Sequence, residues 1–319
     1  MKAIVQERYG SPDGLVLREI DQPAVGDDHV LVKVRAASVN AADWHLMNGL
    51  PHLIGKLMGA TQTSIRGSDL AGVVEAVGKN VTRWRPGDEV FGVGPGAFAE
   101  YATTSQDRLA PRPGNLTFEQ AAAIPVAGLT ALQGLRDRAQ LQPGQRVVVY
   151  GAGGGCGTFA VLIAKALGAH VTAVSSTRNE GMLRSIGADE FIDYTREDFA
   201  ERGGRYDVFF DLGANRSFAD CRRILTPGGA LVLVGAPDGL VRILARLLMA
   251  QARSRIGRQR VVTFMARVVR EDLVALSNLA EAGKLTPAID RAYPLSGVPD
   301  ALRHVGTRAA QGKVVISVA

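Results

Sequence analysis

Residues 146–176 read RVVVYGAGGGCGTFAVLIAKALGAHVTAVSS, and this stretch decides the fold. Its first five residues are mostly apolar and β-branched, as in a strand that is buried on both faces. A glycine-rich turn follows, then a helical run from Gly157 to Leu167, then a second apolar strand at residues 170–175. This strand–turn–helix–strand order is typical of the start of a doubly wound α/β domain.

The glycines of this turn point to a specific kind of ligand. Glycine permits a tight turn and a close approach of a pyrophosphate, and the helix start offers unpaired N–H groups to the phosphates. Spaced as GxxGxxG in this context, they predict a dinucleotide-binding turn, and a purely structural turn is the alternative. Cys156 at the helix start is either a redox-sensitive thiol or, as we favour, a small buried hydrophobe. The residues predicted to line the turn are Gly151, Gly153, Gly154, Gly155, Cys156 and Gly157.

The end of the second strand indicates which dinucleotide binds. An NAD-preferring domain carries Asp or Glu there, about 20 residues past the glycines, to bind the ribose 2′-hydroxyl. This chain has Ser-Ser-Thr-Arg-Asn at residues 175–179, with no carboxylate to repel a 2′-phosphate. The hydroxyls of Ser176 and Thr177 and the guanidinium of Arg178 can bond that phosphate, which predicts NADPH as the cofactor. The alternative is that Arg178 only caps a solvated loop.

The strand–helix alternation continues beyond the turn. Continuously apolar strands such as DVFF and ALVLV are typical of a parallel sheet that is covered on both faces. We predict strands at residues 146–150, 170–175, 190–193, 206–211 and 230–235, and helices at 157–167, 180–186 and 217–225.

The regions on either side of this domain have a different character. The first hundred or so residues alternate short β-rich runs, among them a strand expected at 97–103, with Gly, Pro and Asp, which predicts a small irregular β domain. A capping box of Thr117 with Gln120 predicts a helix start, and a second helix is expected at residues 127–137. The chain again ends in strand-like runs, so we expect it to return and complete the first domain. The predicted boundaries are 1–122 and 266–319 for the β domain and 123–265 for the doubly wound domain.

Length and composition are those of an ordinary two-domain globular protein. The chain has 319 residues, of which 46% are hydrophobic and 21% charged, and a formal net charge of +6. Acids and bases interleave along most of it, so charge alone demands no nucleic-acid partner. Two cysteines cannot build a disulfide framework or a four-thiolate zinc site. With neither a secretory signal nor a run of about 18 apolar residues, the sequence predicts a cytoplasmic protein.

One stretch departs from this charge pattern. Residues 239–270 contain eight arginines and no Asp or Glu, with apolar residues alternating among the first of them. An amphipathic helix at 240–249 would suit a membrane surface or a lid over a lipophilic acceptor. The alternative, which we favour, is an insertion packed between domains or at an oligomer interface.

Several motifs in fixed order resemble those of the medium-chain dehydrogenase/reductase superfamily. They are GSDLAGVVEAVG at 67–78, PGDEVFG at 86–92, GAFAEY at 96–101 and the glycine turn. The resemblance covers essentially the whole chain. It extends to the zinc-independent quinone oxidoreductase branch through the loop STRN at 176–179 and the ending GKVVI at 312–316. It implies a Rossmann domain inserted into a GroES-like, mostly β catalytic domain.

The zinc ligands of the superfamily's alcohol dehydrogenases are missing from this sequence. By the resemblance, Asn40 stands where a cysteine ligand would be, and Ser68-Asp69 follow Gly67 in place of a His-Glu pair. A catalytic zinc needs three strong ligands and an open position, and these positions supply no thiolate or imidazole. Without a Lewis acid, an acceptor that is already electron-poor, such as a quinone or an enone, is the easiest to reduce.

The resemblance also implies which residues meet the cofactor and the acceptor. Asn40 and Thr130 would meet the nicotinamide end; the alternatives are a helix cap for Asn40 and a bond of Thr130 back to its own helix. Asp43 lies on the same loop as Asn40. His45 is either a proton donor to the reduced acceptor or, as we favour, only a lining side chain. Further predicted cofactor contacts, at strand ends or by resemblance, are Tyr194, Leu212, Gly213, Gly235, Ala236, Gly312 and Lys313.

These observations predict a zinc-independent, NADPH-dependent oxidoreductase that delivers hydride to a small lipophilic quinone or enone. A 2-enoyl thioester reductase is the first alternative, and a binding protein that senses NADPH with little chemistry is the second. We expect no nucleic-acid partner and no transmembrane segment, and we do not favour contact with a membrane surface. The resemblance implies a homodimer.

Overall fold

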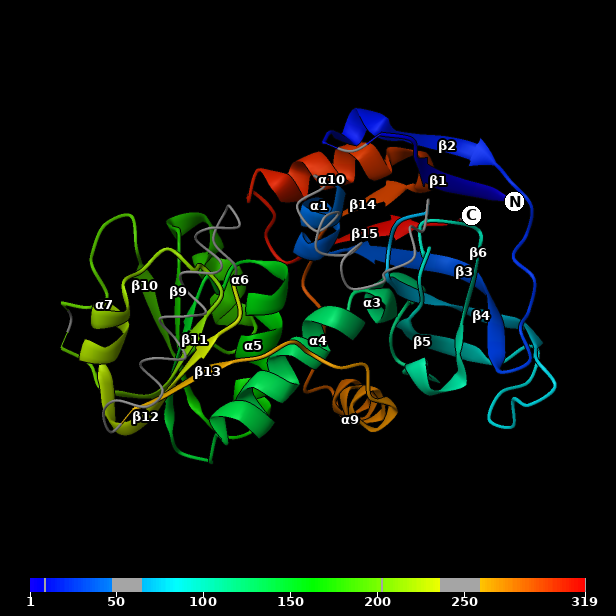
Figure 1. Cartoon of the computed structure of the whole chain (residues 1–319). Helices are drawn as coiled ribbons and strands as arrows, with labels where there is room; N and C mark the ends of the chain where they lie inside the picture. The colour runs from blue at the N-terminus through cyan, green and yellow to red at the C-terminus, as the bar shows by residue number, and fades with distance from the viewer. Residues whose placement is uncertain (9, 48–64, 202, 236–258, 319) are drawn as a thin grey trace. The chain divides into compact units, whose positions relative to one another are not determined.

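The computed structural model describes the chain except residues 9, 48–64, 202, 236–258 and 319 (Figure 1). It forms two compact units, one made of Met1–Leu129 with Val268–Ala319 and the other of Thr130–Arg267. Ala236 and the amphipathic helix predicted at 240–249 lie outside the described residues. Among the helices that are described, none has the length and apolar character that a membrane span requires.

The second unit is built on a six-stranded sheet in which every strand pair is parallel. Its strand order is β10-β9-β8-β11-β12-β13, so the strand that comes first in sequence, β8, lies in the middle beside β11. The winding runs outward from β8 to β10 and then from β11 to β13, which defines a doubly wound fold, as predicted. The strands are β8 (Arg146–Tyr150), β9 (His170–Ser175), β10 (Glu190–Asp193), β11 (Tyr206–Asp211), β12 (Leu225–Leu233) and β13 (Arg260–Thr263).

Burial on both faces explains why these strands are so apolar. Val147, Val148 and Val149 in β8 are fully buried, as are Phe209 and Phe210 in β11. Helix α5 (Gly155–Ala166) packs against β8 and β9, and helix α7 (Phe218–Arg223) packs against β12 (Figure 1). Apolar burial stabilises the fold by about 25 cal/mol per Å², so a polar residue in these strands would be costly.

An aromatic cluster holds the ends of the central strands together. The ring centroid of Tyr150 lies 5.3 Å from that of Phe199 and 6.1 Å from that of Phe209, and the two phenylalanine centroids are 5.5 Å apart. These distances are typical of interacting aromatic pairs. In the β8–β11 pairing, Tyr150 lies opposite Asp211. The carboxyl ends of β8 and β11 are therefore fixed side by side.

The first unit is built on a mostly antiparallel seven-stranded sheet. Its order is β14-β15-β3-β4-β5-β7, and β6 also pairs with β3; β1 and β2 form a separate two-stranded sheet. Strand β15 pairs with β3 with Val314 opposite Val39, so residues 313–317 form part of this sheet. The strands are β1 (Lys2–Gln6), β2 (Leu15–Glu19), β3 (His29–Val39), β4 (Asp69–Val77), β5 (Glu89–Val93), β6 (Tyr101–Ser105), β7 (Leu109–Pro111), β14 (Ile289–Pro294) and β15 (Lys313–Ser317).

Helices of the first unit cover parts of this sheet. Helix α3 contacts β3 and β4, and helix α10 contacts β15 and α1. The predicted capping box is present at the start of α3, where Thr117 accepts from the Gln120 N–H and the Gln120 side chain bonds back. The helices of this unit are α1 (Ala41–Met47), α3 (Phe118–Ala122), α9 (Arg270–Glu281) and α10 (Val298–Gly306), and α4 (Pro125–Leu132) begins in this unit and ends in the second one.

Two predicted elements were wrong in extent. The helix expected at 127–137 is α4 followed by a π-helical segment at Gln133–Ala139, where the Gln133 side chain exchanges two hydrogen bonds with the Arg267 backbone (2.8 and 2.9 Å). A strand was expected at 97–103, whereas β6 begins only at Tyr101. The residues just before Tyr101 pair with β1 instead: the Ile4 N–H donates to the Phe98 carbonyl (2.9 Å), and Ala99 forms an isolated bridge with Ala3.

Candidate functional site

The glycine turn follows β8 at the middle of the parallel sheet. Gly151 has a φ of +87°, a conformation that favours glycine. A Cβ on Gly157 would lie 2.4 Å from the carbonyl oxygen of Gly151, so only glycine lets α5 start this close to the turn. A Cβ on Gly153 would lie 2.2 Å from Nδ2 of Asn179, so that glycine packs the turn against the loop after β9.

The start of α5 is open to a ligand. Its N-cap residue, Gly154, provides no side-chain cap, and a Cβ on Gly154 would meet nothing nearer than 3.7 Å. The Thr158 N–H donates to the Gly154 carbonyl (3.0 Å), so α5 begins directly after the glycine turn. Uncapped N–H groups at the positive end of a 12-residue helix suit an anion such as a pyrophosphate.

Two further loops meet the glycine turn at the same edge of the sheet. A Cβ on Gly151 would lie 3.3 Å from the Gly213 nitrogen, and one on Gly213 would lie 2.3 Å from the Tyr150 ring. A Cβ on Gly235 would lie 2.2 Å from the Leu212 carbonyl oxygen. The backbones after β8, β11 and β12 therefore converge where the winding direction of the sheet reverses, which is where doubly wound domains bind ligands.

The loop after β9 carries a buried amide that sequence reasoning did not single out. Asn179 is only 4% exposed, and its Nδ2 donates to the Ser175 hydroxyl (2.7 Å). Its Oδ1 is buried without a hydrogen-bond partner in the described part of the chain. A buried unpaired oxygen is costly, and a hydroxyl donor of a bound ligand would satisfy it. The side chains of Thr177 and Arg178 in the same loop are exposed.

The fold also brings a carboxylate to this loop. Asp193, at the end of β10, accepts a hydrogen bond from the Thr177 hydroxyl, and its register partner in β9 is Ser175. Hydrogen bonds from the hydroxyls of Thr177 and Thr195 hold the pKa of Asp193 below its ordinary value, so it is ionised at neutral pH. The absence of a carboxylate within residues 175–179 therefore does not make this edge free of negative charge.

In the first unit, a buried polar cluster surrounds Asn40. Its Nδ2 donates to Oδ2 of Asp69 (2.8 Å), and its Oδ1 accepts from Nζ of Lys313 (2.7 Å). Ser38 donates to the same Asp69 oxygen (2.8 Å), and the Val126 N–H donates to the other one (3.0 Å). The side chain of Asn40 is thus bonded into this cluster and does not cap the following helix.

The cluster contains a buried ion pair. Asp69 is fully buried and Lys313 is 2% exposed, with 3.4 Å between Nζ of Lys313 and Oδ2 of Asp69. Placing either charge alone in an apolar interior is very unfavourable, so each depends on the other and on the surrounding hydrogen bonds. Sequence reasoning named Lys313 as a cofactor contact and did not name Asp69 or Ser38 as site residues.

Asp43 lies beside this cluster on the first turn of α1. It is 5% exposed, and its Oδ2 accepts from the Asn40 N–H (2.7 Å). Burial raises the pKa of Asp43 to about 7, and the nearby Asp69 charge adds to the increase, although the Asn40 hydrogen bond and Lys313 oppose it. A carboxyl with this pKa exchanges a proton near neutral pH.

The cluster does not fit a catalytic zinc ion. Together with the neighbouring Asp43, it offers an amide, two carboxyls, a hydroxyl and an ammonium, with no thiolate or imidazole among them. The positive charge that would balance Asp69 is already supplied by Lys313. Across the described residues, no group of three or more His, Cys, Asp and Glu side chains is placed to hold a metal ion.

The remaining predicted site residues fall in several places. His45 lies half-buried on α1, two residues after Asp43, and Gly312 precedes Lys313 with a φ of +93°. Thr130 is half-buried on α4 and belongs to the second unit, whereas Asn40 belongs to the first. Tyr194 is 47% exposed just after β10, and its N–H bonds to the Ser175 carbonyl (3.2 Å).

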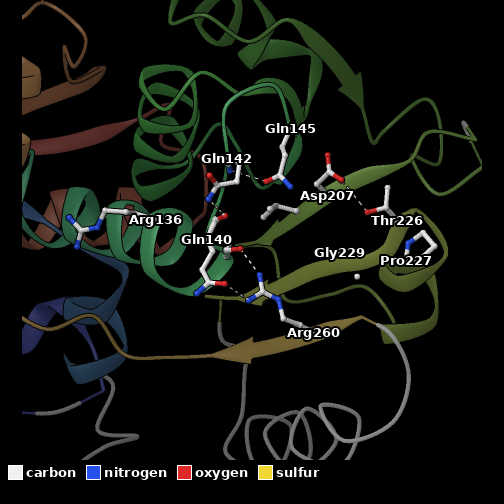
Figure 2. A pocket seen from close by; sticks show the side chains of 12 residues that line it. Arg136, Gln140, Gln142, Gln145, Asp207, Thr226, Pro227, Gly229 and Arg260 are labelled. Atoms are coloured by element: carbon white, nitrogen blue, oxygen red, sulfur yellow. Dashed lines mark hydrogen bonds between the residues drawn. The ribbon is translucent and has the colours of Figure 1, made fainter.

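A separate pocket lies at the other edge of the parallel sheet, shown in Figure 2. It has a volume of about 570 Å³ and surrounds the beginnings of β8, β11, β12 and β13 rather than their ends. None of the predicted site residues lines it. The lining residues are Arg136, Ala139, Gln140, Gln142, Gln145, Asp207, Val208, Thr226, Pro227, Gly228, Gly229 and Arg260.

Comparison with known proteins identifies the family. Residues 26–114 match the alcohol dehydrogenase GroES-like domain, and residues 186–316 match a domain described as zinc-binding dehydrogenase. The chain is 31% identical over 332 residues to the chloroplastic quinone-oxidoreductase QR1 of Triphysaria versicolor, covering 99% of this chain and 98% of that one. It is 34% identical to the chloroplastic NADPH-dependent alkenal/one oxidoreductase of Arabidopsis thaliana, covering 99% and 79%.

A solved structure agrees with these sequence matches. The quinone oxidoreductase from Coxiella burnetii superposes with a TM-score of 0.89 at 30% identity, covering 100% of this chain and 99% of that one. The chain therefore belongs to the medium-chain dehydrogenase/reductase superfamily. Within it, the chain falls in the quinone oxidoreductase-like branch, and it is an oxidoreductase that uses a nicotinamide cofactor.

Proposed function

We propose that the protein transfers hydride from NADPH to a quinone or an α,β-unsaturated carbonyl compound without zinc. The observation that carries this proposal is the buried cluster around Asn40, where Lys313 supplies the positive charge and the polar side chains include no thiolate or imidazole. The printed names of the relatives, a quinone oxidoreductase and an alkenal/one oxidoreductase, agree with this acceptor class. We propose that residues 123–265 bind the nucleotide and that 1–122 with 266–319 form the catalytic domain.

The edge of the second unit would hold the nucleotide. We propose that the N–H groups at the start of α5, where Gly154 provides no side-chain cap, bond the pyrophosphate. The hydroxyl of Ser176 and the guanidinium of Arg178 would bond the 2′-phosphate, with Tyr194 beside them. Other contacts of the nucleotide with this unit would come from Thr130, Gly151, Gly153, Gly154, Gly155, Cys156, Gly157, Thr177, Leu212, Gly213 and Gly235.

The cluster of the first unit would serve the acceptor. Bound NADPH supplies the hydride, and reduction of a quinone or enone also requires a proton. Asn40 has one amide hydrogen left after its bond to Asp69, and this hydrogen could polarise a carbonyl oxygen. We propose Asp43 as a proton source, because its pKa of about 7 lets its carboxyl hold a proton near neutral pH. His45 on the same helix is a second candidate for this role.

A panel of acceptors tests the activity. The purified protein is mixed with NADPH and quinones, enones or a 2-enoyl-coenzyme A, and nucleotide oxidation is followed by absorbance. Turnover with quinones or enones supports the proposal, whereas turnover restricted to the thioester supports the enoyl reductase alternative. Tight NADPH binding without turnover of any acceptor supports the nucleotide-sensing alternative. Stoichiometric zinc that is needed for activity would overturn the zinc-free mechanism.

The preference for NADPH is a separate test of the same site. Ser176 and Arg178 favour a 2′-phosphate, and the ionised Asp193 nearby opposes it, so the two effects compete at this edge. We propose that the exposed guanidinium dominates, because the Asp193 oxygens are engaged by Thr177 and Thr195. Michaelis constants that favour NADH by tenfold or more would contradict this preference.

We further propose that the protein works in the cytosol as a homodimer. Its two cysteines suit a reducing compartment, and the resemblance to this branch implies a dimer. Light scattering on the purified protein at micromolar concentration checks the dimer, and a monomeric mass would contradict it.

A further inference from the structure

We propose that Lys313 is a positioning residue that fixes which way round the Asn40 amide lies, rather than a direct contact of the nucleotide. This inference rests on the proposed function, because it assumes that the remaining amide hydrogen of Asn40 meets the acceptor or the nicotinamide. It assigns to Lys313 a role that differs from the one implied by family resemblance.

The N–H donors of the Lys313 ammonium are all bonded to acceptors within the first unit. Its Nζ lies 2.7 Å from the Asn40 Oδ1, 3.3 Å from the Val39 carbonyl oxygen and 3.4 Å from the Asp69 Oδ2. An ammonium has three N–H donors, and three acceptors of this chain surround it. With a side chain only 2% exposed, Lys313 has neither a spare donor nor an open surface for a phosphate or a carboxamide.

The partners of Asn40 permit only one orientation of its amide. Lys313 can only donate and an ionised Asp69 can only accept, so the amide oxygen must face the lysine and the amide nitrogen must face the carboxylate. Turning the amide over would place its NH₂ against the ammonium and its oxygen against the carboxylate. The amide oxygen and nitrogen are alike in size, so the hydrogen-bonding chemistry of Lys313 and Asp69 decides which position each atom takes.

The backbone forces Lys313 into this place. β15 pairs with β3 with Val314 opposite Val39, which brings Lys313 next to Asn40. The turn before it is fixed as well, because Gly312 has a φ of +93° and a Cβ there would lie 2.3 Å from the Ala288 carbonyl oxygen. The same carbonyl accepts from the Lys313 N–H (2.8 Å). The lysine is thus held by the sheet and needs no ligand to order it.

The experiment separates positioning from stability with two variants. Lys313→Met removes the charge and leaves Asp69 unbalanced, so we expect marked destabilisation. In the double variant Lys313→Met/Asp69→Asn the charges are both gone, so stability should recover to a large extent. The Val126 N–H holds the oxygen of the new amide at position 69, so the NH₂ of that amide faces Asn40 and no longer accepts the Asn40 hydrogen that Asp69 accepts.

Kinetics of the double variant decide between the two roles. We expect kcat with a quinone or enone acceptor to fall about ten- to a hundredfold, a loss typical of a misplaced catalytic group, and KM for NADPH to stay within about twofold. A kcat equal to that of the wild type would overturn the proposal. So would a KM for NADPH raised tenfold with kcat unchanged, because that result would indicate direct contact with the nucleotide.

A matched control is the pair of Lys165 with Asp189, which is partly exposed in the second unit at 2.8 Å. Lys165→Met/Asp189→Asn makes the same chemical changes away from Asn40, and we expect kcat to stay within about twofold of the wild type. If the control loses as much activity as the double variant at 313 and 69, the positioning role is overturned.

A second measurement does not depend on turnover. In protein labelled with ¹⁵N-asparagine, the Asn40 side-chain amide, assigned by its absence in Asn40→Ser, should give two separate, slowly exchanging protons in the wild type. In the folded double variant we expect this signal to broaden or to exchange at least tenfold faster, and an unchanged signal would overturn the positioning role. If no acceptor is turned over, the proposed function fails, and the amide signal still decides the role of Lys313.

Discussion

The edge of the second unit at the glycine turn and the buried cluster of the first unit are built in opposite ways. At the edge, the contacts offered to a ligand are mostly backbone groups, and glycines clear the space around them. In the cluster, the polar atoms belong to side chains of Ser38, Asn40, Asp69 and Lys313, which are buried and bond to one another. A backbone site tolerates changes in side-chain polarity but no added volume. A side-chain network tolerates neither an unmatched charge nor a missing partner.

Removing the carboxylate of the cluster should have the largest effect on stability. Asp69→Ala leaves the ammonium of Lys313 buried without its counter-charge, so we expect the free energy of unfolding to fall by about 3–5 kcal/mol. Denaturation in urea measures this loss. Asp189→Ala, which breaks the partly exposed pair with Lys165, should cost about 1 kcal/mol or less. Equal losses of unfolding free energy in Asp69→Ala and Asp189→Ala would contradict the expectation that burial makes the loss of Asp69 more costly.

The pH dependence of stability should reveal Asp43. Its pKa is about 7 in the folded protein and near the ordinary value of 3.8 when unfolded, so the folded state binds the extra proton between these values. This contribution is fully present below about pH 4 and declines as pH rises to about 7, by at most about 4 kcal/mol. Asp43→Asn should remove the decline. Because other carboxyls with lowered pKa values change stability in the opposite direction, the measurement is the wild-type profile minus the variant profile. A flat difference would contradict the assignment.

The backbone site is tested by added volume. Gly157→Ala places a methyl group 2.4 Å from the Gly151 oxygen, so we expect a loss of about 1–3 kcal/mol in stability and at least tenfold weaker NADPH binding. Gly181→Ala is the matched control, because its Cβ would meet nothing within 4 Å on α6 (Glu180–Ser185). The control should gain up to about 1 kcal/mol from helix propensity. Calorimetric titration with NADPH compares the two variants. Equal affinities would contradict the proposal that the glycine turn binds the nucleotide.

The smallest expected effect concerns the charge next to the nucleotide edge. Arg178→Ala should raise KM for NADPH about tenfold, or roughly 1.4 kcal/mol, and leave KM for NADH nearly unchanged. Asp193→Asn should act in the opposite direction by weakening repulsion of the 2′-phosphate. Steady-state kinetics with both nucleotides checks the pair. If each variant changes KM for NADPH and KM for NADH by the same factor, neither residue distinguishes the two nucleotides.

The two regions also differ in how far the sequence predicts them. The strand–turn–helix–strand stretch at 146–176 predicts the doubly wound domain because its residues are neighbours in sequence and glycine has few other uses there. The family motifs add the β domain that surrounds it in sequence. The π-helical end of α4 was not predicted, and its first residue, Gln133, bonds to Arg267, which is far away in the chain.

The cluster could be predicted only in part. Asn40, Asp43 and Lys313 were named, but nothing in the sequence indicates that Lys313 bonds to Asn40 rather than to a ligand. That contact depends on the β15–β3 register, which joins positions more than 270 residues apart. The same reason hid Asp193 beside Thr177, because only the parallel pairing of β9 with β10 brings them together. The sequence offered one indication of the cluster: Asp69 and Lys313 each stand at the start of a largely apolar strand-like run.

The pairing of β15 with β3 has a consequence for biosynthesis. A ribosome releases β3 and β4 early, yet the lysine that neutralises the carboxylate at the start of β4 arrives only with residue 313. The second unit is one continuous stretch that ends at Arg267, and its sheet needs no strand made later. When residue 267 has been made, the nascent chain therefore has the described parallel strands of the second unit. In the first unit, Asp69 still lacks its counter-charge, Lys313. The Asp69 carboxylate therefore gains its counter-charge only after residue 313 has been made.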